Sequence, residues 1–598
     1  MLSSRRKVIL TWLAFAFIAN PIWCHAVTIL SGPLFTPSTN APLAGLLQLT
    51  TDADSRISVL VSDGTGLWER DFYDYSTNHS VPLLGFKPDQ TNEIQVTVYD
   101  KERNAYTAPD LLTFVTAPLP ATFPHSVVLS SDSGRMEPGY TLFIVYNRSP
   151  NTNYFAIMDN SGTVVWYAPG LAGTVDVRQL DDGNLLYVDS ANSRFVELNM
   201  LGQIVQTWSP PSAYPVNAHD GVPTDHGTLL YLSDVRRTVN RFPINDTQTN
   251  PPQTTVTVAD EPAVEISMTN GTLLNTWSPL DILDPTRVTY LTYGEYSGSP
   301  FGIDNEHANA IIENTNDNSI IVSLRNQNTV FNFTRSGQLK WILGPHALWG
   351  TNWQPYLLTP IGTPFNWNYG QHAPMLTPQG TLLIYNDDNY EASPYDSGVI
   401  DSNNYSFGIE YSIDETNMTV SEVWNSAWQT NQDRLYTPIV GKTQWLPQTR
   451  DILVTYGYVT YVNGLPPSLF STNATMARII EYTHDPVPQV VFDLAFFDYD
   501  NTNANYLGSW TYRAERVPDL YAHPAEPVPD LTVRNQNQVP VLEFSADPDH
   551  TYAIQASTDL VNWTTIGAPV EEGGVGNYDF DDLGAGQFPA RFYRVVTQ

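Results

Sequence analysis

Three histidines stand at the same place relative to a recurring apolar strand. His219 precedes Gly-Thr-Leu-Leu at 227–230 by the same spacing as His372 precedes Gly-Thr-Leu-Leu at 380–383, and His307 precedes a similar strand after a slightly longer turn. Because the chain has only 11 histidines, this repeated placement favours one shared site over scattered surface imidazoles. Imidazoles that converge can bind a metal ion, exchange protons or attack as nucleophiles.

An arginine breaks the pattern at the end of one of these strands. Where the second, third and fifth repeated units carry Asp189, Asp234 and Asp387, the fourth carries Arg325. A guanidinium repels a metal ion but can bind an oxyanion through two parallel hydrogen bonds. The sequence therefore favours an anion-binding site. The alternatives are a three-histidine metal site, a polar contact of each histidine within its own unit, and an ion pair of Arg325 with an aspartate of a neighbouring unit.

The histidines lie within a repeat that runs from about residue 125 to 525. Each unit has an apolar strand, followed later by a turn, a second short strand and an aromatic residue, with no helical pattern between units. A unit of about four strands cannot bury both of its faces alone. We therefore predict an all-β, six-bladed β-propeller whose first strands line a central channel, with a long solenoid or sandwich as the alternative. The six aromatic residues are Trp166, Trp208, Trp277, Trp341, Trp424 and Phe492.

Two smaller all-β segments flank the predicted propeller. Residues 27–124 alternate apolar and polar side chains in short runs, which predicts an N-terminal β-sandwich of the immunoglobulin or fibronectin kind. A proline-rich stretch at 118–124 closes it, because proline cannot continue a central strand. A second proline-rich stretch at 523–529 marks the next boundary. We predict the catalytic propeller at 125–525 and a small C-terminal β domain at 526–598.

The first 26 residues are typical of an export signal. Basic residues at 5–7 precede an apolar run at 8–18, and small residues follow near Ala26. The run is shorter than the roughly 20 residues of a membrane-spanning helix, so we expect a cleaved signal peptide and no retained membrane anchor, with a retained anchor as the alternative. The protein should be secreted, either periplasmic or extracellular, by the general or the twin-arginine route. Cys24 is the only cysteine, so the mature chain would form no disulfide.

Composition argues against one class of partner. The 598 residues include only 28 Lys and Arg and carry a formal charge of −34. Nucleic-acid binding needs clustered cationic side chains, so we expect no nucleic-acid partner. The apolar content of 42% is ample for several buried cores, and we interpret the acidity as a solubilising surface.

Longer motifs around these residues resemble the bacterial arylsulfate sulfotransferase family. The central segment carries Asn-Glu-His-Ala-Asn-Ala-Ile-Ile from 305, Ile-Val-Ser-Leu-Arg-Asn-Gln-Asn from 321, and Gly-Gln-Leu-Lys-Trp-Ile-Leu-Gly-Pro-His from 337. Ala-His-Asp at 218–220 and Gly-Gln-His-Ala-Pro at 370–374 fit the same pattern. The resemblance covers the N-terminal sandwich and the propeller, and the C-terminal module lies outside it.

The resemblance implies an enzyme that moves a sulfuryl group from an aryl sulfate to a phenolic acceptor without a nucleotide sulfate donor, cofactor or metal. It implies ping-pong kinetics through a sulfohistidine at His372. His219, His307, Asn309 and Arg325 would hold the sulfuryl oxygens or handle the phenolic proton. The resemblance also admits a homodimer. Enterobacterial members carry a disulfide, which this mature chain would lack.

Two functions of other classes stay open. A non-catalytic secreted propeller that binds proteins or glycans would not need histidines at equivalent positions. A metal-dependent propeller lyase or hydrolase would hold a metal ion and lose activity with chelators. Within the sulfotransferase interpretation, the sequence does not choose between His219 and His307 as the group that handles the phenolic proton.

Overall fold

The computed structural model describes residues 27–102, 104–149, 151–170, 173–245, 249–293, 302–392, 405–426, 435–460, 475–496, 508–521, 531–536, 539–546, 551–558, 563–571, 576–588 and 590–597. The predicted export signal lies outside these ranges. Within them the regular secondary structure is almost entirely β-strand, and the one α-helix, α1 (Pro279–Ile282), has four residues. No helix in this part of the chain is long and apolar enough to cross a membrane. The predicted all-β class is confirmed.

The N-terminal segment is built on one long strand. β2 (Gly45–Ser62) pairs with β3 (Leu67–Leu83) along one edge, and with β1 (Ile29–Pro37) and then β4 (Thr91–Tyr99) along the other. Two short strands, β5 (Ala105–Thr107) and β6 (Leu112–Val115), pair with β4. Burial alternates along β4 as the sequence pattern predicts, because side chains of a strand point to opposite faces.

Between Ser126 and Val517 the described residues form six sheets of four or five strands, which we number 1 to 6 in the order of their second strands. Sheet 1 contains β34 (Ser509–Val517), β8 (Tyr140–Asn147), β9 (Thr152–Met158) and β10 (Val164–Pro169). Sheet 2 contains β11 (Val177–Gln179), β12 (Leu185–Asp189), β13 (Arg194–Leu198) and β14 (Ile204–Trp208). Sheet 3 contains β15 (Val216–Pro223), β16 (Thr228–Ser233), β19 (Ala263–Ser267) and β20 (Leu273–Trp277).

The remaining three sheets follow the same order of strands. Sheet 4 contains β21 (Ala308–Asn314), β22 (Ser319–Leu324), β23 (Thr329–Phe333) and β24 (Leu339–Leu343). Sheet 5 contains β26 (His372–Leu376), β27 (Leu382–Asn386), β28 (Phe407–Asp414), β29 (Thr419–Asn425) and the short β25 (Thr359–Pro360). Sheet 6 contains β30 (Lys442–Trp445), β31 (Ile452–Val459), β32 (Met476–Tyr482), β33 (Val490–Phe496) and β7 (Ser126–Ser131). A hairpin of β17 (Val235–Pro243) and β18 (Gln253–Asp260) is inserted in sheet 3.

The first strands of these sheets contact one another in sequence and return to the start. β15 contacts β21, β21 contacts β26, β26 contacts β30, and β30 contacts β34, while β34 contacts β11 and β12 contacts β15. β34 comes last in the chain but pairs with β8, near the beginning of the repeat. The ring of sheets is therefore closed by a strand from the far end of the repeat, as in a β-propeller.

The aromatic residue of each predicted unit lies on the fourth strand of its sheet, counted from the inner strand. In sheets 1 to 3 the indole reaches into the next sheet, at the turn before that sheet's last strand. The Nε1–H groups of Trp166, Trp208 and Trp277 donate to the carbonyl oxygens of Met200, Met268 and Arg335, at 2.7, 2.5 and 2.9 Å. These bonds tie neighbouring sheets together at the rim, which explains why the turn and the tryptophan recur together.

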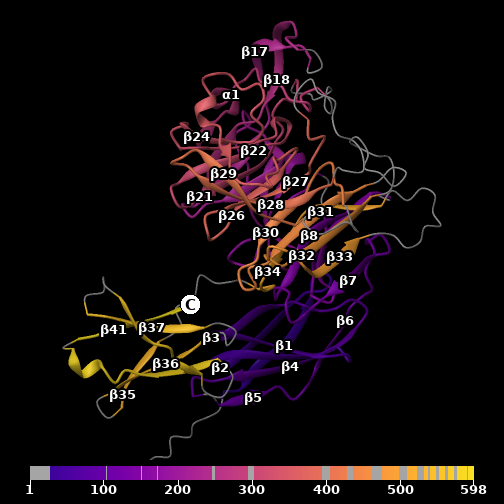
Figure 1. Ribbon diagram of the computed structural model, residues 1–598. Helices are drawn as coiled ribbons and strands as arrows, with labels where there is room; N and C mark the ends of the chain where they lie inside the picture. The colour runs from indigo at the N-terminus through magenta and orange to yellow at the C-terminus, as the bar shows by residue number, and fades with distance from the viewer. Residues whose placement is uncertain are drawn as a thin grey trace, which may run out of the picture.

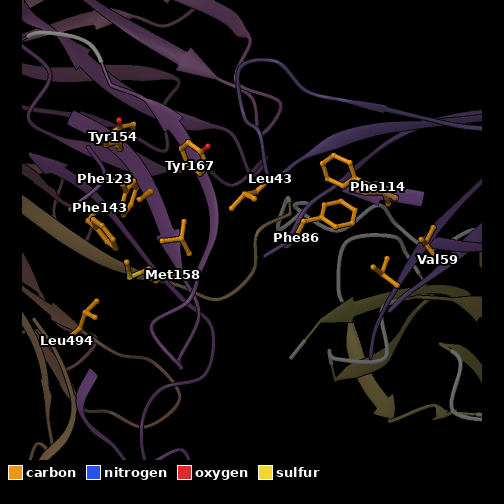
Figure 2. Packing of buried hydrophobic residues seen from close by; sticks show 14 of the residues in the cluster. Leu43, Val59, Phe86, Phe114, Phe123, Phe143, Tyr154, Met158, Tyr167 and Leu494 are labelled. Carbon is orange, nitrogen blue, oxygen red and sulfur yellow. The ribbon is translucent and has the colours of Figure 1, made fainter. Parts of the chain in front are cut away.

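One apolar cluster joins the N-terminal segment to the propeller. Leu43 and Phe86 of the first belong to the same cluster as Phe143 and Leu494 of the second (Figure 2). Phe123, from the proline-rich stretch at 118–124, packs on Tyr154 with ring centroids 5.0 Å apart. The stretch between the two parts is therefore packed against the propeller.

The C-terminal module has a core of its own. Its strands form two sheets around Leu542, Phe544 and Ile554. In Figure 1 these yellow strands lie beside the indigo N-terminal segment, and Gly576 lies directly against the Tyr73 ring of β3. The strands are β35 (Thr532–Gln536), β36 (Val539–Ser545), β40 (Asn577–Asp581) and β39 (Val570–Glu571), then β38 (Thr564–Gly567), β37 (Tyr552–Ser557) and β41 (Phe592–Thr597).

Candidate active site

The three histidines singled out by the sequence come from the first strands of three neighbouring sheets. His219 lies on β15, His307 directly precedes β21, and His372 begins β26. The rings of His219 and His307 are 4.8 Å apart, and the rings of His219 and His372 lie 6.1 and 6.3 Å from the same phenol, Tyr512. The repeated placement in the sequence therefore corresponds to one site at the inner strands.

Each of these inner strands is irregular where it carries its histidine. The pairing register shifts between Val216 and Gly221 in β15, between Ala308 and Ala310 in β21, and between His372 and Met375 in β26. Bulges of this kind re-aim side chains and are common beside active sites. The backbone of His307 is left-handed, with φ of 50°, which is uncommon for a residue other than glycine.

His372 is held at both ring nitrogens. Its Nδ1 lies 3.1 Å from Oδ1 and 3.0 Å from Oδ2 of Asp387, and the backbone N–H of Val440 donates to its Nε2 at 3.3 Å. A carboxylate can only accept, so Nδ1 carries the proton and Nε2 presents its lone pair. The arrangement selects one neutral tautomer, with a weakly bonded nitrogen available for reaction.

Burial keeps this imidazole neutral. The His372 side chain is only 2% exposed. Burial lowers the pKa of His372 well below its ordinary value, and the charges of Arg325, Arg513, His307 and His219 lower it further. Burial lowers the pKa of His219 in the same way, followed by the charges of His307 and Arg513. Both side chains are therefore uncharged at neutral pH.

His307 has a different environment. Its Nδ1 lies 2.8 Å from Oδ2 of Asp304, and its side chain is 14% exposed. Burial raises the pKa of Asp304, but the charge and the hydrogen bond of His307 outweigh burial, so this pKa lies below its ordinary value. Asp304 therefore stays ionised beside His307.

Other carboxyl groups lie behind His307. The N–H of Ala308 donates to the Glu261 carboxyl, and the N–H of Glu261 donates to Oε2 of Glu306 at 3.0 Å. Burial raises the pKa values of Glu261 and Glu306 well above their ordinary values, and neighbouring carboxylates add to the shift. Both residues are therefore biased towards their neutral forms, and Asp304 is left as the anion that faces His307.

Arg325 and Asn309 are deeply buried and hold the loops of the site. Nη2 of Arg325 donates to Oδ1 of Asn389 at 3.1 Å and to the Pro438 carbonyl at 2.9 Å. Nε of Arg325 lies 3.9 Å from Asp387, so the ion pair with a neighbouring unit that the sequence left open is present. Nδ2 of Asn309 donates to the Gln371 carbonyl at 2.7 Å. The two-pronged grip of Arg325 on an oxyanion stays a prediction.

The polar motif residues around these positions lock the loops together. Nε2 of Gln327 donates to the Asn305 carbonyl at 2.7 Å, and Nδ2 of Asn326 donates to the Asp304 carbonyl at 2.8 Å. Nε2 of Gln371 donates to the carbonyl oxygens of Leu324 and Thr329 and to the Ser323 hydroxyl, at 3.1, 3.0 and 3.0 Å. The segments from 305, 321 and 370 thus form one hydrogen-bonded support for the histidines.

Four site residues were not predicted as such from the sequence. Asp387 and Asp304 orient the histidines, and Tyr512 and Arg513 of β34 complete the site from sheet 1. A signal existed for Asp387, because it follows His372 at the same separation as Asp234 follows His219. That signal is ambiguous, since Asp234 interacts with Glu261 instead of pairing with His219.

Several buried polar atoms at the site have no hydrogen-bond partner among the described residues. They are Nδ1 of His219, Oδ1 of Asp304, Oδ1 of Asn309 and Nε of Arg513. Buried polar atoms are normally satisfied, so such a group identifies a place where a polar ligand or water can bind. Within the described ranges, no three His, Cys, Asp or Glu side chains are arranged to hold one metal ion.

Comparisons with known proteins match most of the chain. A family model described as arylsulfotransferase (ASST) matches residues 97–506, and one described as arylsulfotransferase Ig-like domain matches residues 34–114. Arylsulfate sulfotransferase AssT of Escherichia coli O6:H1 (strain CFT073) is 26% identical over 289 residues, which cover 41% of this chain and 45% of the relative. The AssT of Lelliottia amnigena is 24% identical over 310 residues, which cover 45% of this chain and 49% of the relative. The chain thus spans about half the length of these relatives.

Solved structures give more distant matches. A protein of unknown function from Bacteroides caccae has a TM-score of 0.35 and 12% identity, with 63% of this chain and 98% of that chain covered. Virginiamycin B lyase from Staphylococcus aureus has a TM-score of 0.27 and 8% identity, with 61% of this chain and 88% of that chain covered.

Proposed function

The chain belongs to the arylsulfotransferase family, and from this premise we propose that it moves a sulfuryl group from an aryl sulfate to a phenol through His372. The observation that carries the proposal is the fixed tautomer of this buried imidazole. Asp387 accepts from Nδ1, and among the described residues a single 3.3 Å bond, from the Val440 amide, engages Nε2. A neutral imidazole with an available lone pair is a competent nucleophile.

In the first half-reaction, the Nε2 lone pair of His372 attacks the sulfur of the aryl sulfate. The bond from sulfur to the aryl oxygen breaks, and the phenol departs after receiving a proton. The ring then carries a proton on Nδ1 and the sulfuryl group on Nε2, so it has a positive charge. The Asp387 carboxylate, 3.0 Å from Nδ1, stabilises that charge, and the sulfuryl group takes the place of the Val440 hydrogen bond.

In the second half-reaction, a phenolic acceptor loses its proton and its oxygen attacks the sulfur. The bond from Nε2 to sulfur breaks, and His372 returns to its neutral form. Donor and acceptor use the same pocket in turn, which gives ping-pong kinetics. The overall exchange consumes one aryl sulfate and one phenol and yields one of each, so no other reactant is required.

We assign the proton transfers to His307. Its Nδ1 is oriented by the ionised Asp304 at 2.8 Å, so its other nitrogen can give a proton to the leaving phenolate and take one from the incoming phenol. His219 has no carboxylate bonded to its ring among the described residues, and its pKa is well below the ordinary value. His219 therefore acts as a neutral hydrogen-bonding group.

Arg325 and Asn309 contribute charge and position. The Arg325 guanidinium lies within 3.9 Å of Asp387, so it supplies positive charge close to His372. Fixed charges of this kind stabilise the developing charge on sulfuryl oxygens in a site with little water. Asn309 bonds the Gln371 carbonyl, directly before His372, and so helps to fix the nucleophile. The export signal proposed at 1–26 would direct this chemistry outside the cytoplasm.

The test is phenol release from para-nitrophenyl sulfate with and without an acceptor phenol. We expect turnover only with the acceptor, and about one equivalent of phenol per protein chain without it. His372→Asn should abolish both the turnover and a sulfuryl label on the protein. His226→Asn is the matched control, because His226 is a surface imidazole with a side chain 59% exposed. Continuous phenol release without an acceptor would show hydrolysis instead of transfer. Near-normal turnover of the His372→Asn variant would refute the assignment of His372 as the nucleophile.

A further inference from the structure

We propose that Arg513, on the strand that closes the ring, is a positioning residue that braces the sulfuryl-transfer site from sheet 1. The inference rests on the proposed function, since the reaction supplies one of its readouts. Arg513 lies on β34, and its side chain is 6% exposed. It contacts residues of sheets 3 and 4 and also Asp176, directly before sheet 2, so it connects the inner strands.

Hydrogen bonds connect Arg513 to the strand that carries the proposed nucleophile. Nη2 of Arg513 donates to the Asn309 carbonyl at 2.8 Å, and the neighbouring Tyr512 hydroxyl lies 3.4 Å from the same oxygen. The side chain of Asn309 in turn bonds the Gln371 carbonyl at 2.7 Å. Because His372 follows Gln371 directly, two hydrogen bonds connect Arg513 to the strand of the nucleophile.

A second set of contacts connects Arg513 to the strand of His219. Nη1 of Arg513 lies 3.1 Å from Asp220, the residue after His219, and 3.4 Å from Asp176 at the start of sheet 2. Asp220 also accepts the N–H of Ile311 at 3.0 Å. Arg178 bonds both aspartates, at 2.8 and 3.1 Å, so two cations and two anions balance in this network. A buried network of this kind holds its members in one geometry.

The backbone places Arg513 at the position where other sheets present histidines. The register of β34 against β8 shifts between Thr511 and Ala514, so Tyr512 and Arg513 occupy the irregular part of the strand. The inner strands of sheets 3, 4 and 5 are irregular at their histidines. Sheet 1 therefore contributes to the same site by the same device, with a phenol and a guanidinium in place of an imidazole.

The charge of Arg513 also reaches the histidines. It is among the groups that lower the pKa values of His372 and His219, after burial and after the larger effects of Arg325 and His307 respectively. Removing the Arg513 cation should therefore raise the pKa values of both histidines, and this change can be measured independently of activity.

The experiment compares two arginines of the same strand. Arg513→Lys keeps the charge but cannot reach Asn309, Asp220 and Asp176 at once. We expect kcat with para-nitrophenyl sulfate and phenol to fall about tenfold to a hundredfold, with KM changed less than about threefold. Arg516→Lys is the control, since Arg516 is equally buried but pairs with Glu481 at 2.9 Å, away from the histidines. It should keep kcat within about twofold of the unaltered protein.

A second pair of changes guards against simple misfolding. Arg513→Met with Asp176→Asn removes one cation and one anion, so no buried charge is left uncompensated. In ring-labelled protein, the histidine NMR titrations of His219 and His372 should move to higher pH in this double variant. Unchanged titrations, or an Arg513→Lys variant as active as Arg516→Lys, would overturn the inference. If the unaltered protein transferred no sulfuryl group, the proposed function would be refuted. The histidine titrations would still test the role of Arg513.

Discussion

At the scale of single residues, the site depends on which imidazole nitrogen carries a proton. In the proposed reaction the sulfur can bond only to a nitrogen with a free lone pair, and the hydrogen bond from Nδ1 to Asp387 leaves Nε2 of His372 as that nitrogen. His307 has its own aspartate, and His219 has none bonded to its ring among the described residues. In the proposed reaction, three residues of one type thereby take three roles: His372 is the nucleophile, His307 transfers protons and His219 is a neutral hydrogen-bonding group.

The first expectation concerns that carboxylate. Asp387→Asn retains the shape of the side chain, but its amide can donate to Nδ1 and stabilise the tautomer with the proton on Nε2. We expect kcat to fall about 10²- to 10⁴-fold, as for other imidazoles that lose an orienting aspartate. Steady-state assays with an aryl sulfate and a phenol measure the change.

Asp189→Asn is the control for this change. Asp189 occupies the equivalent place at the end of the second strand of sheet 2, where it bonds Asn192 and Arg194 and has no hydrogen bond to a histidine among the described residues. Its variant should retain the turnover of the unaltered protein. Equal effects of the two substitutions would mean that Asp387 has only a structural role.

The second expectation is a pH profile. Burial, first, and then nearby cations lower the pKa of His372 well below its ordinary value, so the neutral nucleophile persists as the solution becomes mildly acidic. The rate of the first phenol release should therefore stay constant between about pH 7.5 and about pH 6, where an ordinary histidine becomes largely protonated. Rapid-mixing measurements with an acidic leaving phenol, which needs little protonation, follow this step directly. A rate that falls by half near about pH 6.5 would contradict a buried neutral nucleophile.

At the scale of elements, the sequence could predict the repeat but not the ring's closure. The turns, apolar strands and tryptophans are local, and each carries its own signal in successive residues. The inner strand of sheet 1, by contrast, is β34, which pairs with β8 more than 350 residues earlier in the chain. No local pattern identifies that partner, so Tyr512 and Arg513 could not be assigned to the site.

The same limit applies to the aspartates of the site. Asp304 bonds His307, whose backbone is left-handed, and a sequence does not display backbone torsions. Asp387 and Asp234 follow a histidine at the same separation, yet only Asp387 pairs with it. Repetition predicted where the imidazoles lie, whereas the local bulges decide which neighbour each ring contacts.

The third expectation tests the rim hydrogen bonds between sheets. Trp277 and Trp424 are comparably buried, at 7% and 5% exposure, but only Trp277 has a hydrogen bond at its Nε1 among the described residues. Trp277→Phe removes the donor and leaves the Arg335 carbonyl without it, so its cost should exceed that of Trp424→Phe by about 1–2 kcal/mol. Both changes remove the same volume, which cancels the packing cost to a first approximation.

Urea unfolding followed by far-ultraviolet circular dichroism measures both variants of the rim. The difference between the two midpoints, multiplied by the common slope, gives the free energy assigned to the hydrogen bond. If both variants lost the same free energy of unfolding, the indole would stabilise the rim by packing alone. The size of the ring would then explain why tryptophan recurs.

At the scale of the whole molecule, the net charge opposes the chemistry proposed at the centre. A chain with a formal charge of −34 repels an anionic aryl sulfate at long range. The cations of the site are themselves compensated, since Arg325 lies 3.9 Å from Asp387 and Arg513 pairs with Asp220 and Asp176. Little positive potential therefore extends beyond the inner strands, and the long-range field is that of the acidic surface.

The fourth expectation is that salt accelerates capture of the donor. Screening shortens the reach of charge from about 30 Å at about 0.01 M salt to about 8 Å at about 0.15 M, and so removes most of the repulsion. We expect kcat/KM for an anionic aryl sulfate to rise about twofold to tenfold over this range, while kcat/KM for a neutral phenol changes less than twofold. The neutral acceptor is the internal control, because it binds the same pocket in the same assay. A fall in donor kcat/KM with salt would mean that the buried arginines focus a positive potential at the channel mouth despite their aspartate partners.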